Sequence, residues 1–138
     1  MKSAAAILAF LIAAPITLPA WADCPLDLGR GTGWVLFSDQ YMIAFRPDPI
    51  RIEVGAPFSL VLNICTKKNE PAELVSIEAT MPEHKHGMNY QPSVSRVSPG
   101  LYRADGLMFH MPGRWELVFE LHSASGAVHR LTQRLTID

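Results

Sequence analysis

The amino-acid sequence predicts an all-β protein, an immunoglobulin-like antiparallel β-sandwich of seven to eight strands after an N-terminal signal peptide. Three observations support this fold class. Beyond residue 22, apolar and polar residues alternate with a period of two in most segments, and no segment sustains a helical period. Eleven prolines and nine glycines among 138 residues indicate many turns. Several segments have one apolar and one polar face, which two packed sheets bury most simply, with a small barrel as the alternative.

The first 22 residues are expected to form a signal peptide. Lys2 gives a short positive region, an apolar run extends from Ala4 to Ala14, and Ala20-Trp21-Ala22 has the small residues of a cleavage site. The apolar run is shorter than the roughly 20 residues that a membrane span needs, and an uncleaved anchor is the alternative. We therefore expect a periplasmic or otherwise extracytoplasmic protein, soluble after cleavage, that meets a membrane only through its signal peptide.

Residues 23–138 have the length of a single domain that can bury a core of its own. Twelve lysines and arginines stand against thirteen acidic residues, so the chain is almost neutral. This balance argues against nucleic acid or an anionic membrane as the main partner.

Two cysteines follow the signal peptide, Cys24 and Cys65. In an oxidising compartment such a pair is most simply a disulfide. Closing a loop of about 40 residues would contribute roughly 4 kcal/mol on the chain-entropy model. The alternative is that one of the two cysteines binds a metal.

The first four expected strands are 33–37, 41–45, 58–64 and 74–81. The first two are short apolar runs joined by the polar Ser38-Asp39-Gln40. The third begins after the turn residues Val54-Gly55-Ala56-Pro57 and alternates in polarity. The fourth follows a polar loop with two lysines and alternates up to Met81, which we expect in the core.

The last four expected strands are 93–97, 101–109, 115–121 and 131–137. The first has the weakest pattern and ends at Ser98-Pro99-Gly100, and the second leads into Met111-Pro112-Gly113. In the third, every second residue from Trp115 to Leu121 is apolar and alternates with Glu116, Glu120 and His122, so one face is expected to be buried. The fourth alternates in the same way after a Ser/Gly turn.

Two segments concentrate histidine and methionine. The first reads M-P-E-H-K-H-G-M-N-Y from Met81, and its His84, His86 and Met88 share one face of an extended backbone because they are two residues apart. The second, L-M-F-H-M-P-G from residue 107, holds His110 and Met111. Together they contain three of the five histidines and four of the six methionines. Imidazole and thioether donors together suit copper better than zinc, calcium or magnesium.

Strands that run alternately up and down would bring the two clusters to one pole of the sandwich. The segment 74–81 ends where the first cluster begins, and 101–109 runs back towards that pole and ends at the second. The lysine loop and Cys65 then lie at the other pole. A shared ion needs donor atoms about 3.5 Å apart, and residues two apart in a strand can lean together to reach this.

The expected metal ligands are His84, His86, Met88, His110 and Met111, with Met108 as a reserve sulfur donor. His84 and His86 would form one edge of the site, Met88 would supply a third donor, and the second cluster would close it. One alternative is that the histidines are solvated surface residues and the methionines fill gaps in the core. Another is that the clusters, with the nearby Phe109, Trp115 and Tyr90, cap the end of the core and their histidines are satisfied there. His122 and His129 lie near the opposite turn and are expected at the surface.

The clusters M-P-E-H-K-H-G-M and L-M-F-H-M-P-G-R-W-E-L resemble the signature of the YtkA-like family of small exported bacterial proteins, from about Tyr41 onwards. This resemblance implies an immunoglobulin-like sandwich. The use of histidine and methionine is also similar to that of periplasmic copper chaperones that feed cytochrome oxidase and bind Cu(I). On that similarity, His84, Met88, His110 and Met111 would be the ligands.

The sequence thus predicts a protein that binds or delivers copper, as Cu(I) or Cu(II), to an envelope copper-requiring or redox protein. The alternative is an interaction module without metal that docks an envelope partner through its Met- and aromatic-rich pole. We do not expect an enzyme, because no serine or cysteine nucleophile lies beside a base and no carboxylate pair suits acid–base catalysis. A copper redox enzyme with the same ligands is the remaining enzymatic reading.

Overall fold

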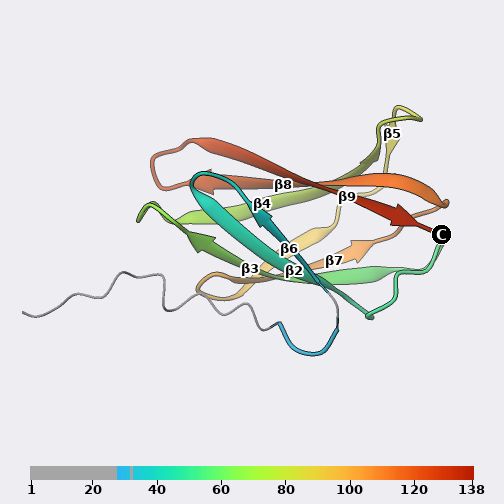
Figure 1. Cartoon of the computed structure of the whole chain (residues 1–138), viewed down its shortest axis with the longest axis horizontal. Helices are drawn as coiled ribbons and strands as arrows, with labels where there is room; N and C mark the ends of the chain where they lie inside the picture. The colour runs from blue at the N-terminus through green and yellow to red at the C-terminus, as the bar shows by residue number, and fades with distance from the viewer. Residues whose placement is uncertain (1–27, 32) are drawn as a thin grey trace, which may run out of the picture.

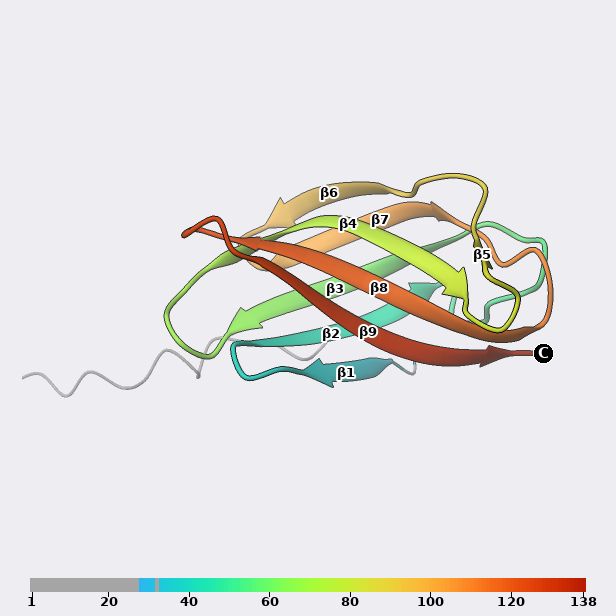
Figure 2. The ribbon, with the colours of Figure 1, turned by 90° about the horizontal axis from the view of Figure 1, so that it is seen from above.

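Nine strands form two antiparallel sheets in a computed structural model that describes residues 28–31 and 33–138 (Figure 1). The strands are β1 (Trp34–Phe37), β2 (Tyr41–Asp48), β3 (Phe58–Thr66), β4 (Ala72–Met81), β5 (His86–Gly87), β6 (Ser93–Ser98), β7 (Leu101–Leu107), β8 (Gly113–Ser123) and β9 (Val128–Ile137). One sheet has the order β1-β2-β3-β7-β6 and the other β5-β4-β8-β9. The two sheets form the layers of a sandwich, which Figure 2 shows from above.

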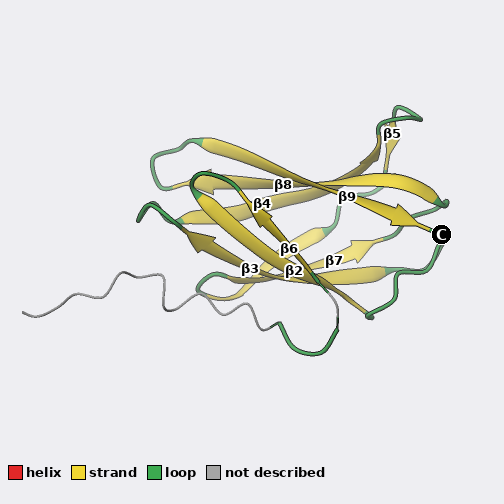
Figure 3. Ribbon diagram, in the orientation of Figure 1, coloured by secondary structure: helices red, strands yellow, loops and turns green. Residues whose placement is uncertain are grey.

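The predicted fold class is confirmed, with one strand more than the sequence patterns indicate. The described chain consists of strands and loops, without a helix (Figure 3). The additional strand is β5, whose two residues lie inside the first His/Met cluster. Two residues are too few to show a period, so alternation cannot reveal such a strand. The seventh strand also ends at Leu107 rather than at residue 109.

The sheets meet through the apolar faces that the alternation predicts. In β8 the fully buried side chains are Trp115, Leu117, Phe119 and Leu121. Aromatic contacts join the layers, since the rings of Phe45 in β2 and Phe119 have centroids 5.0 Å apart. Each such side chain contributes about 1.5–3 kcal/mol by leaving water, so the core can hold the fold together without a metal.

Strand register brings both His/Met clusters to one pole of the sandwich. Thr80 near the end of β4 pairs with Glu116 near the start of β8, and Phe58 at the start of β3 pairs with Leu107 at the end of β7. The segments after β4 and before β8 therefore lie together, as the alternating strand directions predict. Figures 1 and 2 both place β5 and the carboxyl terminus at this end. We call residues 81–90 and 107–113 the tip.

The opposite pole holds the lysine loop, Cys65 and the β8–β9 turn. The amide of Ala124 donates to the carbonyl of Pro71 at 3.0 Å, which joins that turn to the lysine loop. His129 at this pole was expected at the surface, and this prediction is wrong. It is half-buried, and its ring lies 5.0 Å from that of the buried Tyr41, because β9 turns this side chain towards the end of the core.

Two expectations concern residues that are not described. The signal peptide at 1–22 lies outside the described residues, and so does Cys24. Cys65, which lies within the described residues, is not a free thiol. Its pairing with Cys24 stays a prediction. Within 28–31 and 33–138, no helix is long and apolar enough to cross a membrane.

Candidate metal centre

The first cluster forms a narrow hairpin at the end of β4. The chain turns through 82–85, where Lys85 has a positive φ of 55° and the amide of His84 donates to the carbonyl of Met81 at 3.0 Å. It then returns as β5, in which His86 pairs with Met81. Directly paired residues of an antiparallel sheet project to the same face, and Met81 is only 1% exposed. The backbone therefore directs His86 towards the rim of the core.

The second cluster is the connection from β7 to β8. Phe109 is fully buried, and its carbonyl accepts a hydrogen bond from the amide of Gly55 at 2.8 Å, which fixes this loop to the β2–β3 connection. The Tyr90 hydroxyl donates to the carbonyl of Met108 at 3.1 Å, so the two clusters are tied to each other. Burial raises the pKa of Tyr90 above its ordinary value, which keeps the hydroxyl protonated as a donor.

Three imidazoles from the two clusters contact one another in succession, and we call them the row. The ring centroids of His84 and His86 are 5.7 Å apart, and those of His86 and His110 are 5.2 Å apart. Two imidazoles that share one ion at bond lengths of about 2.1 Å, with roughly tetrahedral angles, have centroids about 5 Å apart. Both neighbouring pairs are therefore spaced as two ligands of one ion would be. His84 and His110 are exposed and His86 is half-buried.

Trp115 forms the floor beneath this row. It is fully buried, and its ring meets those of His86 and His110 edge to face, at centroid distances of 6.0 and 5.2 Å. Phe109 packs against the same indole at 4.8 Å. The indole nitrogen donates to the carbonyl of Met111 at 3.1 Å. One side chain of β8 thus supports residues from both clusters.

The methionines of the tip divide by burial. Met81 belongs to the core, as the sequence predicts, whereas Met88 and Met111 are half-buried and pack against the core from outside. Met108 is half-buried too, and its carbonyl is the acceptor for Tyr90. The amide of Met88 donates to the carbonyl of Ala79 at 3.0 Å, which continues the pairing of β5 with β4. Met88 therefore follows His86 on the same face.

The histidines do not form a closed metal site on their own. Across the described part of the chain, no group of three or more His, Cys, Asp or Glu side chains is placed to hold a metal ion. A pair such as His86 and His110 would therefore need further donors to bind an ion. Met88 and Met111 lie in the same two clusters as this pair and carry soft thioether donors, and the combination of imidazole and thioether suits copper.

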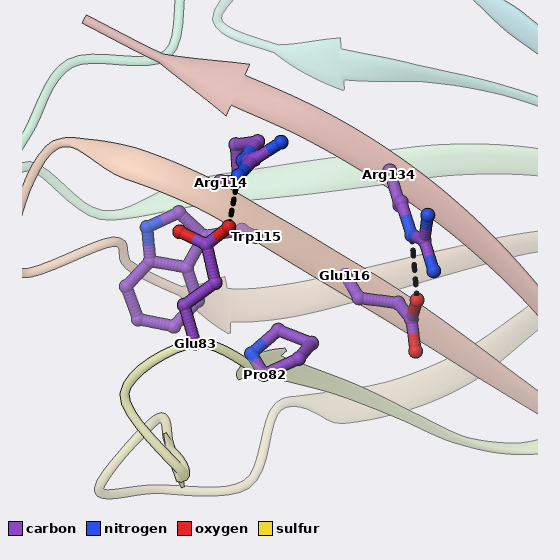
Figure 4. Close-up of a pocket in the computed structure, with 6 residues that line it drawn as sticks. All are labelled: Pro82, Glu83, Arg114, Trp115, Glu116 and Arg134. Carbon is purple, nitrogen blue, oxygen red and sulfur yellow. Dashed lines mark hydrogen bonds and ion pairs between the residues drawn. The ribbon is translucent and has the colours of Figure 1, made fainter.

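A hollow of about 220 Å³ lies next to the tip, lined by Pro82, Glu83, Arg114, Trp115, Glu116 and Arg134 (Figure 4). Two ion pairs cross it. Arg114 donates to Glu83 of the hairpin turn, and Arg134 of β9 donates to Glu116 at 3.2 Å. The pairing of Glu83 with Arg114 was not predicted from the sequence, because the two residues are 31 positions apart and no local pattern links them.

The structure brings together the three predicted histidines and the backbones of both predicted methionines. Trp115 was missed as a site residue, because its alternation with polar neighbours indicates only a buried position in a strand. Comparison with family models matches residues 37–120 to a family described as YtkA-like. The match covers more than half of the chain and includes all of the tip. A comparison with curated proteins finds no match.

Proposed function

The chain belongs to the YtkA-like family, and we propose that it is an exported copper-binding or copper-delivery protein whose binding site is the tip. The observation that carries this proposal is the row of His84, His86 and His110, whose neighbouring centroids are 5.7 and 5.2 Å apart. Half-buried Met88 and Met111, from the same two clusters, pack against the core. Imidazoles from two distant segments thus meet at the tip, and the same segments supply the methionines of the proposed site.

Exposure of the donors suggests how copper is taken up and passed on. His84 and His110 face solvent, so they can meet an incoming ion and later exchange it with the ligands of an envelope copper-requiring or redox protein. His86 and the two methionines lie deeper and would retain the ion between these events. Because only neutral imidazole binds a metal, affinity should weaken as the pH falls.

The proposal is tested by titrating residues 23–138 with Cu(I) and with Cu(II), followed by the same titration of a His84→Ala/His86→Ala variant. We expect the variant to lose most of its affinity, because it lacks two of the three rings. The matched control is His122→Ala, which removes an exposed histidine that bonds to Glu120 at 3.0 Å far from the tip. Equal affinity in the double variant and the control would discard the site.

A second function, docking of an envelope protein without metal, is favoured by two features of the tip. The described histidines and carboxylates form no ready metal site, and the aromatic Tyr90 is 38% exposed beside the half-buried methionines. On this reading Met88→Ala or Met111→Ala would weaken capture of the partner, and copper would not bind stoichiometrically. On either reading we propose no catalytic activity.

A further inference from the structure

The hairpin turn that carries His84 is tied to the neighbouring strand by an ion pair. The Arg114 guanidinium at the start of β8 donates to a carboxylate oxygen of Glu83, the residue directly before His84 (Figure 4). Glu83, His84 and Lys85 are all exposed, so no packing in the core fixes them. The ion pair is thus a side-chain link between this turn and the rigid sheet.

We propose that Arg114, acting through Glu83, is a positioning residue that holds the His84 imidazole beside the ring of His86. This inference rests on the proposed function, because it assigns the support of one of the metal ligands. It adds Arg114 and Glu83 to the proposed copper site as residues that support a ligand without contacting the ion.

His84 is the ring that requires such support. His86 and His110 both pack against the buried Trp115, at centroid distances of 6.0 and 5.2 Å. The ring contact described for His84 is with His86 alone, at 5.7 Å. Its position therefore depends on the conformation of the turn. The turn is held at its base by the 3.0 Å bond from the His84 amide to Met81 and at its apex by Glu83.

The hollow beside the tip offers a matched control. Arg134 pairs with Glu116 at 3.2 Å in the same hollow, but this pair joins β8 to β9 and does not involve the turn. Replacing either arginine by glutamate makes the same change in charge close to the site. A simple field effect predicts that both replacements attract a cation and strengthen binding. A positioning role predicts instead that Arg114→Glu weakens copper binding although its added negative charge should strengthen it, and that Arg134→Glu does not weaken it.

The effect should be modest, because the pair is exposed. The side chains of Arg114 and Glu83 are 69% and 53% exposed, and solvent screens their attraction. We expect copper affinity to fall about two- to fivefold in Arg114→Glu. It should not fall in Arg134→Glu. The exchanged variant Glu83→Arg/Arg114→Glu restores an ion pair at the same place and should return the affinity to that of the parent protein.

A measurement without metal separates this inference from the proposed function. In the metal-free protein, NMR should detect a nuclear Overhauser contact between ring protons of His84 and His86, and this contact should weaken in Arg114→Glu and return in the exchanged variant. If the contact persists unchanged in Arg114→Glu, the positioning role is wrong even if copper binds. If copper fails to bind the parent protein while the contact still depends on Arg114, the proposed function fails and only the structural link survives.

Discussion

Trp115 is the residue whose replacement tests most directly how the core supports the tip. In Trp115→Phe the smaller ring still fits the space between Phe109 and the histidines, but the donor to the carbonyl of Met111 is lost. The change therefore removes a buried hydrogen bond and part of the floor, and keeps all the proposed copper donors.

The cost follows from two terms. Phenylalanine has three fewer heavy atoms than tryptophan, and their loss from a fully buried position costs about 1–2 kcal/mol. The missing hydrogen bond at 3.1 Å costs about 0.5–1.5 kcal/mol. We expect the free energy of unfolding to fall by roughly 1.5–3.5 kcal/mol. Copper affinity should fall about tenfold, the smaller of the losses typical for residues that orient metal ligands.

Urea unfolding and copper titration of the same samples measure both effects. The control is Trp34→Phe, which changes a half-buried tryptophan stacked on Phe45 in the first two strands. It should lower stability less than Trp115→Phe and leave copper affinity unchanged. The reasoning would be refuted if both variants had the same stability and the same copper affinity.

Two further predictions concern stability. The Ser125 hydroxyl holds the pKa of Glu70 below its ordinary value of 4.5. The folded state therefore gains stability from this carboxylate above pH 4.5 and loses it as the pH falls through the lowered pKa. In Glu70→Gln, the urea midpoint should depend less on pH between about pH 6 and pH 3 than in the parent protein. Gly113→Ala should lower the free energy of unfolding by about 1–3 kcal/mol, because the residue has a φ of 133° and a Cβ there would lie 2.6 Å from the Met81 side chain. Gly126→Ala, with a φ of 87° and open space around the Cβ, should cost less, and equal urea midpoints for the two alanine variants would contradict the clash.

Much of the sandwich could be predicted from period-two patterning. The segment from Trp115 to Leu121 shows the reason, since Trp115, Leu117, Phe119 and Leu121 are fully buried while the residues between them lie on the other, more exposed face. The segment around His86 shows where the reasoning fails. Its strand has two residues and exists because the end of β4 offers backbone partners to it. Its existence depends on long-range pairing, which no local pattern encodes.

Side-chain contacts between residues far apart in the chain could not be predicted, for the same reason. The prediction that His129 lies at the surface was wrong, because contact with Tyr41 depends on how β9 crosses the end of the core. Likewise, the pairing of Glu83 with Arg114 arises only after β4 and β8 have come together.

The sequence alone determined which chemical donors this protein carries and which segments become strands, because composition and alternation are local properties of the chain. It also placed both His/Met segments at one pole, since antiparallel strands reverse direction in order. Only the tertiary structure decided that the three imidazoles lie 5.2 to 5.7 Å from their neighbours and that the rings of His86 and His110 pack against Trp115. Those spacings result from strand register and from packing between sheets, which join residues far apart in the chain.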